Sequence, residues 1–247
     1  MIGKFVREEF IELAKVSEKT ERYDEMIGFM LIAAKFEQDF SEEDRKLFSL
    51  AIKKSTIPKR NACAQISSIQ EKQDKDEQQY RNCIQSYKLK IGRELIQICE
   101  DILEVADNCL NNKTITIESK VFYLKIKGDS YRILAEQDFG NAHTANDAFE
   151  AYSLGYDIAQ QNLCPLNSNR LSLTNNFCVL FYEILHDPTK ACLIGQKLIN
   201  LALNHKEAKD CDKCNDLTSK TALCLLVDNV KYWKYLQSEN DQHPEEM

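Results

Sequence analysis

The chain has 247 residues, only 7 of them glycine and 4 proline, and its formal net charge is −7 at neutral pH. So few turn-forming residues disfavour a sandwich, a barrel or an alternating βα fold. The net negative charge disfavours binding of nucleic acid or an anionic membrane through the overall electrostatic field. No two glycines lie within ten residues of each other, which excludes glycine-rich phosphate loops and the nucleophile elbow of α/β-hydrolases.

Apolar residues recur with helical spacing along almost the whole chain, as Val6, Phe10 and Leu13 do near its start. Ser41 and Asp44 match a capping box, and Asp187 with Pro188 matches an N-cap residue followed by a first-turn proline. Loop signals are sparse, and short connections favour antiparallel neighbours. We therefore expect an all-α fold of nine antiparallel helices at 3–18, 20–37, 42–72, 76–110, 118–137, 144–162, 168–185, 188–206 and 214–237.

The sequence shows no self-similar period, so it indicates no tandem repeat, although a solenoid-like arrangement of helices fits the pattern. We expect a single domain over residues 1–237 and a disordered tail over the polar, acidic residues 238–247. Residues 1–10 lack the apolar core of a signal peptide, no apolar run approaches 18 residues, and ten cysteines without a secretion signal indicate reduced thiols. The expected location is cytoplasmic, without insertion into a membrane.

Two pairs of basic residues repeat one spacing on two expected helices. Lys53 and Arg60 lie seven residues apart, as do Lys125 and Arg132, and Asp129 stands between the latter two. Two helical turns separate the members of each pair, so both side chains of a pair point the same way. Spacing alone leaves two interpretations open, which are two solvated helix faces or two walls of an anion site.

Several motifs, in order along the chain, resemble the 14-3-3 family. The most extensive is residues 120–132, which resemble the signature helix of that family. Shorter similar motifs occur at residues 22–26, 66–72, 176–185, 187–192 and 228–233. The resemblance covers about residues 5–237 and is weakest at 73–115, 138–150 and 204–218. On these motifs the chain is identified as a divergent member of the 14-3-3 family.

The resemblance implies a cup-shaped monomer with an amphipathic groove. The implied function is that of an adaptor, which regulates client proteins by docking their phosphoserine or phosphothreonine segments in this groove. By the same resemblance the phosphate-binding residues are Lys53, Arg60 and Arg132. The other implied groove residues are Lys125, Asn176, Val179, Glu183, Leu223, Leu225, Asn229 and Trp233. No cofactor, metal or catalytic group is implied.

The residue types also suit such a ligand on chemical grounds. A phosphate ester carries nearly two negative charges and three acceptor oxygens, which guanidinium groups meet as bidentate forks. An asparagine amide offers one donor side and one acceptor side, which match the groups of an extended peptide backbone. Asn176 and Asn229 each interrupt an apolar stripe on their helix, which is typical of a lined groove. The alternative for each asparagine is a buried amide satisfied inside the core.

Several positions depart from the family pattern. Ile133 stands where the family has a tyrosine, which removes one hydrogen-bond donor to the phosphate. Pro58 lies inside the third expected helix, where it removes a backbone hydrogen bond and is expected to kink the helix near Arg60. Asn175 replaces an expected apolar groove residue, and Cys63 replaces an aromatic one. These changes bear on ligand preference more than on the fold.

The resemblance also implies a homodimer, or a heterodimer with other family members. The expected interface residues are Val16, Arg22, Glu25, Ile66, Tyr87, Lys90 and Glu94. Four of them are charged and keep opposite signs on the two sides of the expected interface. Exposed ion pairs contribute little free energy, so the apolar residues must supply most of the affinity. The alternative is that the four charges are ordinary surface residues.

Two other functions compete with a phosphopeptide adaptor. One is a helical scaffold that binds unphosphorylated acidic or amphipathic peptides, with phosphate dependence lost through Ile133 and Pro58. The other is an α-helical enzyme, but the four histidines are scattered and no acid–base or metal cluster is visible. Cys211 and Cys214 form a lone C-x-x-C pair, and a structural zinc ion needs four ligands, so we expect two free thiols. Three retained cations favour the phosphopeptide adaptor.

Overall fold

The computed structural model describes residues 6–36, 39–71, 78–136, 143–207 and 216–242, and within these ranges the regular structure is helical throughout. The helices are α1 (Arg7–Lys19), α2 (Tyr23–Ala34), α3 (Glu42–Glu71), α4 (Gln78–Asn111), α5 (Ile117–Glu136), α6 (Thr144–Asn162), α7 (Ser168–Val179), α8 (Pro188–Glu207) and α9 (Leu217–Gln242). A π-helical turn, η1 (Leu180–Ile184), follows α7. The all-α class and the nine expected helices are therefore confirmed for the described residues, with ends that differ by a few positions.

The described residues divide into two compact units. The first unit falls within residues 1–115 and 133–141, and the second within residues 116–132 and 142–247. α5 contributes its last turn to the first unit and the rest of its length to the second. α9 continues through Gln242, so the helix includes the first five residues of the expected tail, and residues 243–247 lie outside the described part.

Helix starts that the sequence marks are capped in the structure. At α3, the backbone N–H of Asp44 donates to Oγ of Ser41 at 3.2 Å and the carboxylate of Asp44 accepts from the N–H of Ser41 at 3.1 Å. This is the reciprocal capping box that the sequence predicted. At α8, Oδ1 of Asp187 accepts from the N–H of Lys190 at 2.9 Å, as expected for an N-cap before Pro188.

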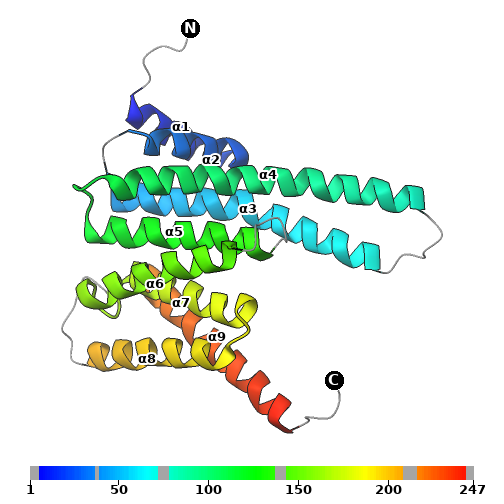
Figure 1. Ribbon diagram of the computed structural model, residues 1–247. Helices are drawn as coiled ribbons and strands as arrows, with labels where there is room; N and C mark the ends of the chain where they lie inside the picture. The colour runs from blue at the N-terminus through cyan, green and yellow to red at the C-terminus, as the bar shows by residue number, and fades with distance from the viewer. Residues whose placement is uncertain (1–5, 37–38, 72–77, 137–142, 208–215, 243–247) are drawn as a thin grey trace. The chain divides into compact units, whose positions relative to one another are not determined.

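In the first unit the long helices α3 and α4 run side by side (Figure 1). The helix pair α1 and α2 packs on them, and Met26, Met30 and Phe48 are fully buried in this unit. Pro58 stands near the middle of α3, and in Figure 1 the helix turns away from α4 in its second half. Because α3 nevertheless continues to Glu71, Pro58 redirects the helix without ending it.

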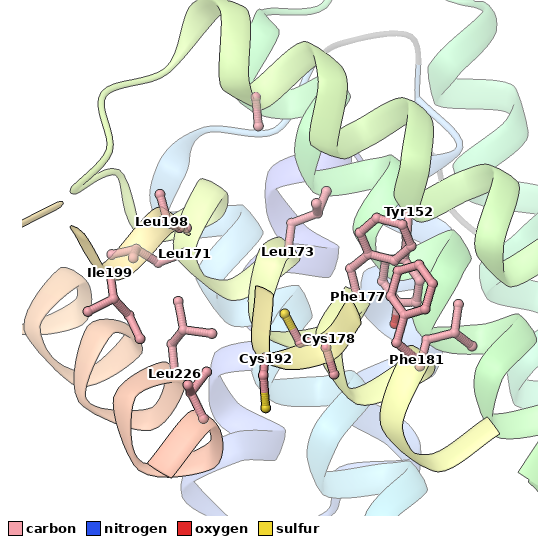
Figure 2. Packing of buried hydrophobic residues seen from close by; sticks show 14 of the residues in the cluster. Tyr152, Leu171, Leu173, Phe177, Cys178, Phe181, Cys192, Leu198, Ile199 and Leu226 are labelled. Atoms are coloured by element: carbon pink, nitrogen blue, oxygen red, sulfur yellow. The ribbon is translucent and has the colours of Figure 1, made fainter. Parts of the chain in front are cut away.

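The core of the second unit lies among α6, α7, α8 and α9. Figure 2 shows its aromatic side chains at one end, with Tyr152, Phe177 and Phe181 close together, and its aliphatic side chains at the other. The ring centroids of Phe177 and Phe181 lie 4.9 Å apart. The buried sulfur atoms of Cys178 and Cys192 lie between the two ends. This core fixes the inner faces of α7 and α9, and of the expected groove residues it includes Trp233, while Val179 and Leu223 pack against it.

Candidate functional site

Asp129 on α5 is the centre of a buried hydrogen-bond network in the second unit. Its Oδ2 accepts from Nζ of Lys125 at 2.8 Å, and its Oδ1 accepts from Nδ2 of Asn176 at 2.7 Å and from the hydroxyl of Tyr152. We call these four residues the Asp129 network. The side chains of Lys125 and Asp129 are only 11% and 14% exposed, so the ion pair is largely withdrawn from water. Lys125 is therefore held in place by its carboxylate.

Gly128 allows Tyr152 to reach this carboxylate. A Cβ atom at position 128 would lie 2.7–2.9 Å from three ring atoms of Tyr152, closer than carbon atoms pack in proteins. The tyrosine ring therefore lies directly on the backbone of α5, and its hydroxyl meets Asp129 one residue further along. Because the ring is rigid and fully buried, it has no space into which to withdraw.

The network keeps Asp129 ionised. Burial alone would raise the pKa of Asp129, but the charges of Lys125 and Arg132 and the hydrogen bonds from Lys125 and Tyr152 outweigh it and hold the pKa below its ordinary value of 3.8. Burial and the nearby charge of Asp129 raise the pKa of Tyr152 well above 10. At neutral pH the carboxylate can only accept hydrogen bonds and the phenol remains a donor.

Arg132 lies on α5 one turn before the end of the helix and is 9% exposed. Its Nη1 lies 3.8 Å from a carboxylate oxygen of Glu183, whose side chain is half exposed. Glu183 belongs to the π-helical turn η1, which is closed by the N–H of Leu185 donating to the carbonyl of Leu180 at 3.0 Å. The sequence predicted a continuous α-helix there. The π turn adds a residue to one turn and so changes the direction in which later side chains point.

The two asparagines expected to bind a ligand backbone are joined through a third. Asn175 on α7 donates from Nδ2 to Oδ1 of Asn176 at 3.3 Å, and its own Oδ1 accepts from Nδ2 of Asn229 on α9 at 2.9 Å. Asn176 and Asn229 are half-buried, whereas Asn175 is only 4% exposed. The expected apolar position is therefore occupied by a buried amide whose donor and acceptor are both used.

The expected apolar groove residues differ in exposure. Leu225 is exposed, while Val179 and Leu223 are half-buried and pack against the core of the second unit. Trp233 is buried, and its ring stacks on that of Tyr182 with centroids 5.1 Å apart and planes 17° from parallel. Trp233 is thus a buried support for the apolar wall of the expected groove. Val179, Leu223 and Leu225 each have exposed surface that a ligand can contact.

The remaining expected phosphate-binding residues belong to the first unit. Lys53 is exposed on α3. Nη2 of Arg60 donates to Oε2 of Glu136 at 2.5 Å, and the two side chains are 28% and 13% exposed. Burial raises the pKa of the nearby Cys99 thiol to about 12, and it outweighs the opposing effects of the Arg60 and Glu136 charges, which lower and raise that pKa. Glu136 was not among the expected site residues, although its place four residues after Arg132 is a local sign of a shared helix face.

The expected dimer residues lie in the first unit and fall into two groups. Residues of an interface must be exposed when the partner is absent, and this holds for Val16, Tyr87, Lys90 and Glu94. Arg22 and Glu25 are also exposed, and they pair with each other within the chain at the start of α2. Ile66 is 9% exposed and packs with Cys63 and Ile91 inside the unit, so it offers little surface to a partner.

No group of three or more histidine, cysteine, aspartate or glutamate side chains in the described ranges could hold a metal ion. The cysteines within those ranges form no disulfide bond with one another, and Cys211 and Cys214 lie outside them. Among the described helices, none combines the length and apolar character that crossing a membrane requires.

Comparison with known proteins identifies the family. The profile of the family described as "14-3-3 protein" matches residues 13–234. Protein BMH2 of Saccharomyces cerevisiae is 38% identical over 240 residues, which cover 96% of this chain and 87% of that protein. The 14-3-3-like protein 2 of Caenorhabditis elegans is 36% identical over 229 residues, or 92% of this chain and 91% of that one. The checkpoint signal transducer rad24 of Schizosaccharomyces pombe is 36% identical over 230 residues, with 92% and 84% covered. The chain therefore belongs to the 14-3-3 family of non-enzymatic adaptors, which bind client proteins.

Proposed function

We propose that this protein docks extended segments of client proteins that carry phosphoserine or phosphothreonine, and that it regulates these clients without catalysing a reaction. The observation that carries the proposal is the arrangement of Asn176 and Asn229 in the second unit. Two half-buried amides, from α7 and α9, belong to one hydrogen-bonded system that also contains Lys125. Backbone-like amides beside a fixed cation suit an extended, negatively charged peptide.

The proposed phosphate ligands are Lys53, Arg60 and Arg132. Arginine suits this role because its planar guanidinium donates two parallel hydrogen bonds to a phosphate. While it is paired with Glu136, Arg60 keeps 28% of its side chain exposed, so a ligand can contact part of it. Ile133 is 4% exposed and carries no donor, so the phosphate is bound mainly through charge.

The proposed assembly is a homodimer, or a heterodimer with other family members, formed through the first unit. Exposed Val16 and Tyr87 support this proposal. These large side chains are 55% and 59% exposed, and covering their apolar surface with a partner would stabilise the dimer. Lys90 and Glu94 on α4 and Arg22 and Glu25 on α2 supply opposite charges. We place the protein in the cytoplasm, where thiols stay reduced.

The test is calorimetric titration of the full chain with a synthetic phosphoserine peptide and with the same peptide unphosphorylated. We expect only the phosphorylated peptide to bind. Arg132→Ala is expected to weaken binding by about 3 kcal/mol, roughly a hundredfold, because the phosphate loses a charge-assisted partner. The matched control is Lys127→Ala, which removes a cation of α5 that lies over the ring of Tyr131. Equal binding of both peptides would instead support the scaffold for unphosphorylated ligands.

A further inference from the structure

Asn175 lies outside the groove residues that the sequence singled out, yet it connects two of them. It is buried on α7, where it accepts from Asn229 of α9 and donates to Asn176. Asn176 in turn donates to Asp129 of α5. Four side chains from three helices thus form one continuous series of hydrogen bonds within the second unit. A buried amide in an apolar core is retained without penalty only when its donor and acceptor are satisfied, as they are here.

The charge of Asp129 sets the direction of every hydrogen bond in this series. A carboxylate only accepts, so Asn176 must turn its Nδ2 toward Asp129 and its Oδ1 the other way. That Oδ1 then needs a donor, which is Nδ2 of Asn175. The Oδ1 of Asn175 consequently faces Asn229 and accepts from its Nδ2. One buried anion therefore fixes which edge of three successive amides points in which direction.

The last member of the series, Asn229, is half-buried on α9. Because its Nδ2 is turned toward Asn175, its planar amide directs Oδ1 away from Asn175, together with the second N–H of Nδ2. That edge matches the N–H and the carbonyl of one residue in an extended backbone, since Oδ1 accepts from the backbone N–H and the second N–H donates to the carbonyl. With an apolar residue at position 175, nothing in the series would prevent the amide of Asn229 from turning over.

We propose that Asn175 is a positioning residue that holds the amides of Asn176 and Asn229 in one orientation, so that Asn229 presents Oδ1 to a backbone N–H of the bound peptide. This inference rests on the proposed function, since it concerns how the ligand backbone is recognised. It adds a selectivity to that function, because a ligand residue without an N–H, such as proline, is disfavoured at the position facing Asn229. Without Asn175, the amide of Asn229 would have to lose its rotational freedom when the peptide binds. This entropy cost would lower the affinity for the peptide about two- to tenfold.

The first arm of the test examines the free full-length protein. Asn175→Leu removes the donor and the acceptor at similar volume. Thr174→Val is the matched control, because Thr174 precedes Asn175 on α7, is fully buried, and has an Oγ1 without a hydrogen-bond partner among the described residues. We expect hydrogen exchange of the Asn229 side-chain amide, followed by NMR, to become about tenfold faster in Asn175→Leu. It should stay at the parent rate in Thr174→Val.

The second arm uses a nine-residue phosphoserine peptide, selected as the tightest binder of the parent protein from a randomised pool. A set of analogues replaces one backbone amide at a time by an ester, which removes a single N–H. The parent and Thr174→Val are expected to lose about tenfold in affinity at one position of the peptide, where Asn229 accepts the N–H. At that same position Asn175→Leu should lose less than about twofold. Asn175→Ala repeats the measurement if the circular dichroism of the leucine variant departs from that of the parent.

The outcomes separate the two proposals. An unchanged exchange rate of Asn229, or the same ester profile in Asn175→Leu and the parent, overturns the positioning role of Asn175 and leaves phosphopeptide binding in place. If the parent binds the selected peptide no better than its unphosphorylated twin, the proposed function fails, and the positioning role fails with it. The binding of the parent alone tells these failures apart.

Discussion

Two carboxylates on α5 hold basic side chains in different ways. Asp129, in the second unit, accepts hydrogen bonds from Lys125, Asn176 and Tyr152 in a site with little access to water. Glu136, in the first unit, faces Arg60, which keeps more than a quarter of its side chain exposed. The first arrangement is structural and fixed, because moving any of its side chains leaves a buried polar group without a hydrogen-bond partner. The second is an ion pair accessible on its arginine side alone, since Glu136 is only 13% exposed, and that arginine can be shared with a ligand.

The difference assigns separate tasks to the basic residues. Lys125 neutralises Asp129 and is committed to the network, so its contribution to ligand binding is a fixed field near the amides. Arg60 has more access to solvent than Lys125, since its side chain is 28% exposed although that of Glu136 is only 13% exposed, so water competes mainly for the arginine. Between Lys125 and Arg60, the degree of burial therefore separates the structural cation from the one that a ligand can share.

The largest expected effect is on stability, from replacing the central carboxylate. Asp129→Asn leaves Lys125 buried without its counterion and replaces one of the two acceptor oxygens by an NH2 group, so at least one of the present donors loses its acceptor. A loss of about 3–5 kcal/mol in the free energy of unfolding is expected. Glu136→Gln is the comparison variant and should lose no more than about 1 kcal/mol, since the side chain of Arg60 stays partly exposed to water. Urea unfolding followed by circular dichroism measures both, and equal losses would contradict the distinction between the two sites.

A second prediction concerns acid. Because the pKa of Asp129 in the folded protein lies below the ordinary value of 3.8, its stabilising contribution is complete above that value and is lost as the pH falls toward the folded pKa. Within this window the loss is at most about 1.4 kcal/mol for each pH unit, because one proton is taken up on unfolding. Urea unfolding at a series of pH values should show a shallower acid dependence for Asp129→Asn than for the parent. Parallel curves would show that Asp129 is not held ionised.

Much of the fold could be predicted from the sequence because helix signals are local. Apolar spacing located the helices, and the short-range caps at Ser41 and Asp187 formed as expected. The interior of the site could not be predicted in the same way. Asn176 and Asp129 are 47 residues apart, and Asn229 and Asn175 are 54 apart, so their contacts depend on how helices pack. A helical stripe shows which residues share a face, but not which partner faces them.

The same limit explains two other differences. Asn175 was expected to alter an apolar groove wall, because its position in the stripe is apolar in the family, yet it is buried and paired with two other amides. Ile66 stays a predicted interface residue, and the sequence did not indicate that it packs with Cys63 and Ile91 within its own unit. Helical spacing placed both residues on the correct elements. Their surroundings depend on rotations of a few tens of degrees, which spacing does not determine.

A pair of glycine substitutions tests how tightly the two units are packed around their helices. Gly128→Ala forces a methyl group against the ring of Tyr152 and is expected to destabilise the protein by about 1–3 kcal/mol, the usual cost of overpacking. Gly28→Ala, within α2, meets nothing within 4 Å and should stabilise by about 0.5–1 kcal/mol, because alanine favours the helix. Thermal and urea unfolding measure both changes. A neutral or stabilising Gly128→Ala would show that Tyr152 does not lie on the backbone of α5.

The smallest predicted effect concerns the accessible ion pair and acts on binding. In the proposed function Arg60 must share its guanidinium between Glu136 and the ligand phosphate, so the carboxylate competes with the phosphate. Glu136→Gln removes that competition and should tighten binding of the phosphoserine peptide by up to about fivefold, the equivalent of about 1 kcal/mol. The unphosphorylated peptide should still not bind. Calorimetric titration at low and high salt measures both.

The control for this prediction is the same substitution made in Arg60→Ala. If Glu136 acts by occupying Arg60, removing its charge should have no effect once Arg60 is absent, so the two substitutions should be non-additive. Equal tightening with and without Arg60 would mean that Glu136 repels the phosphate through space. Such a long-range effect is screened over a Debye length of about 8–10 Å and should fade at high salt, whereas direct competition for one guanidinium should persist. The salt series therefore separates a shared cation from a general acidic field.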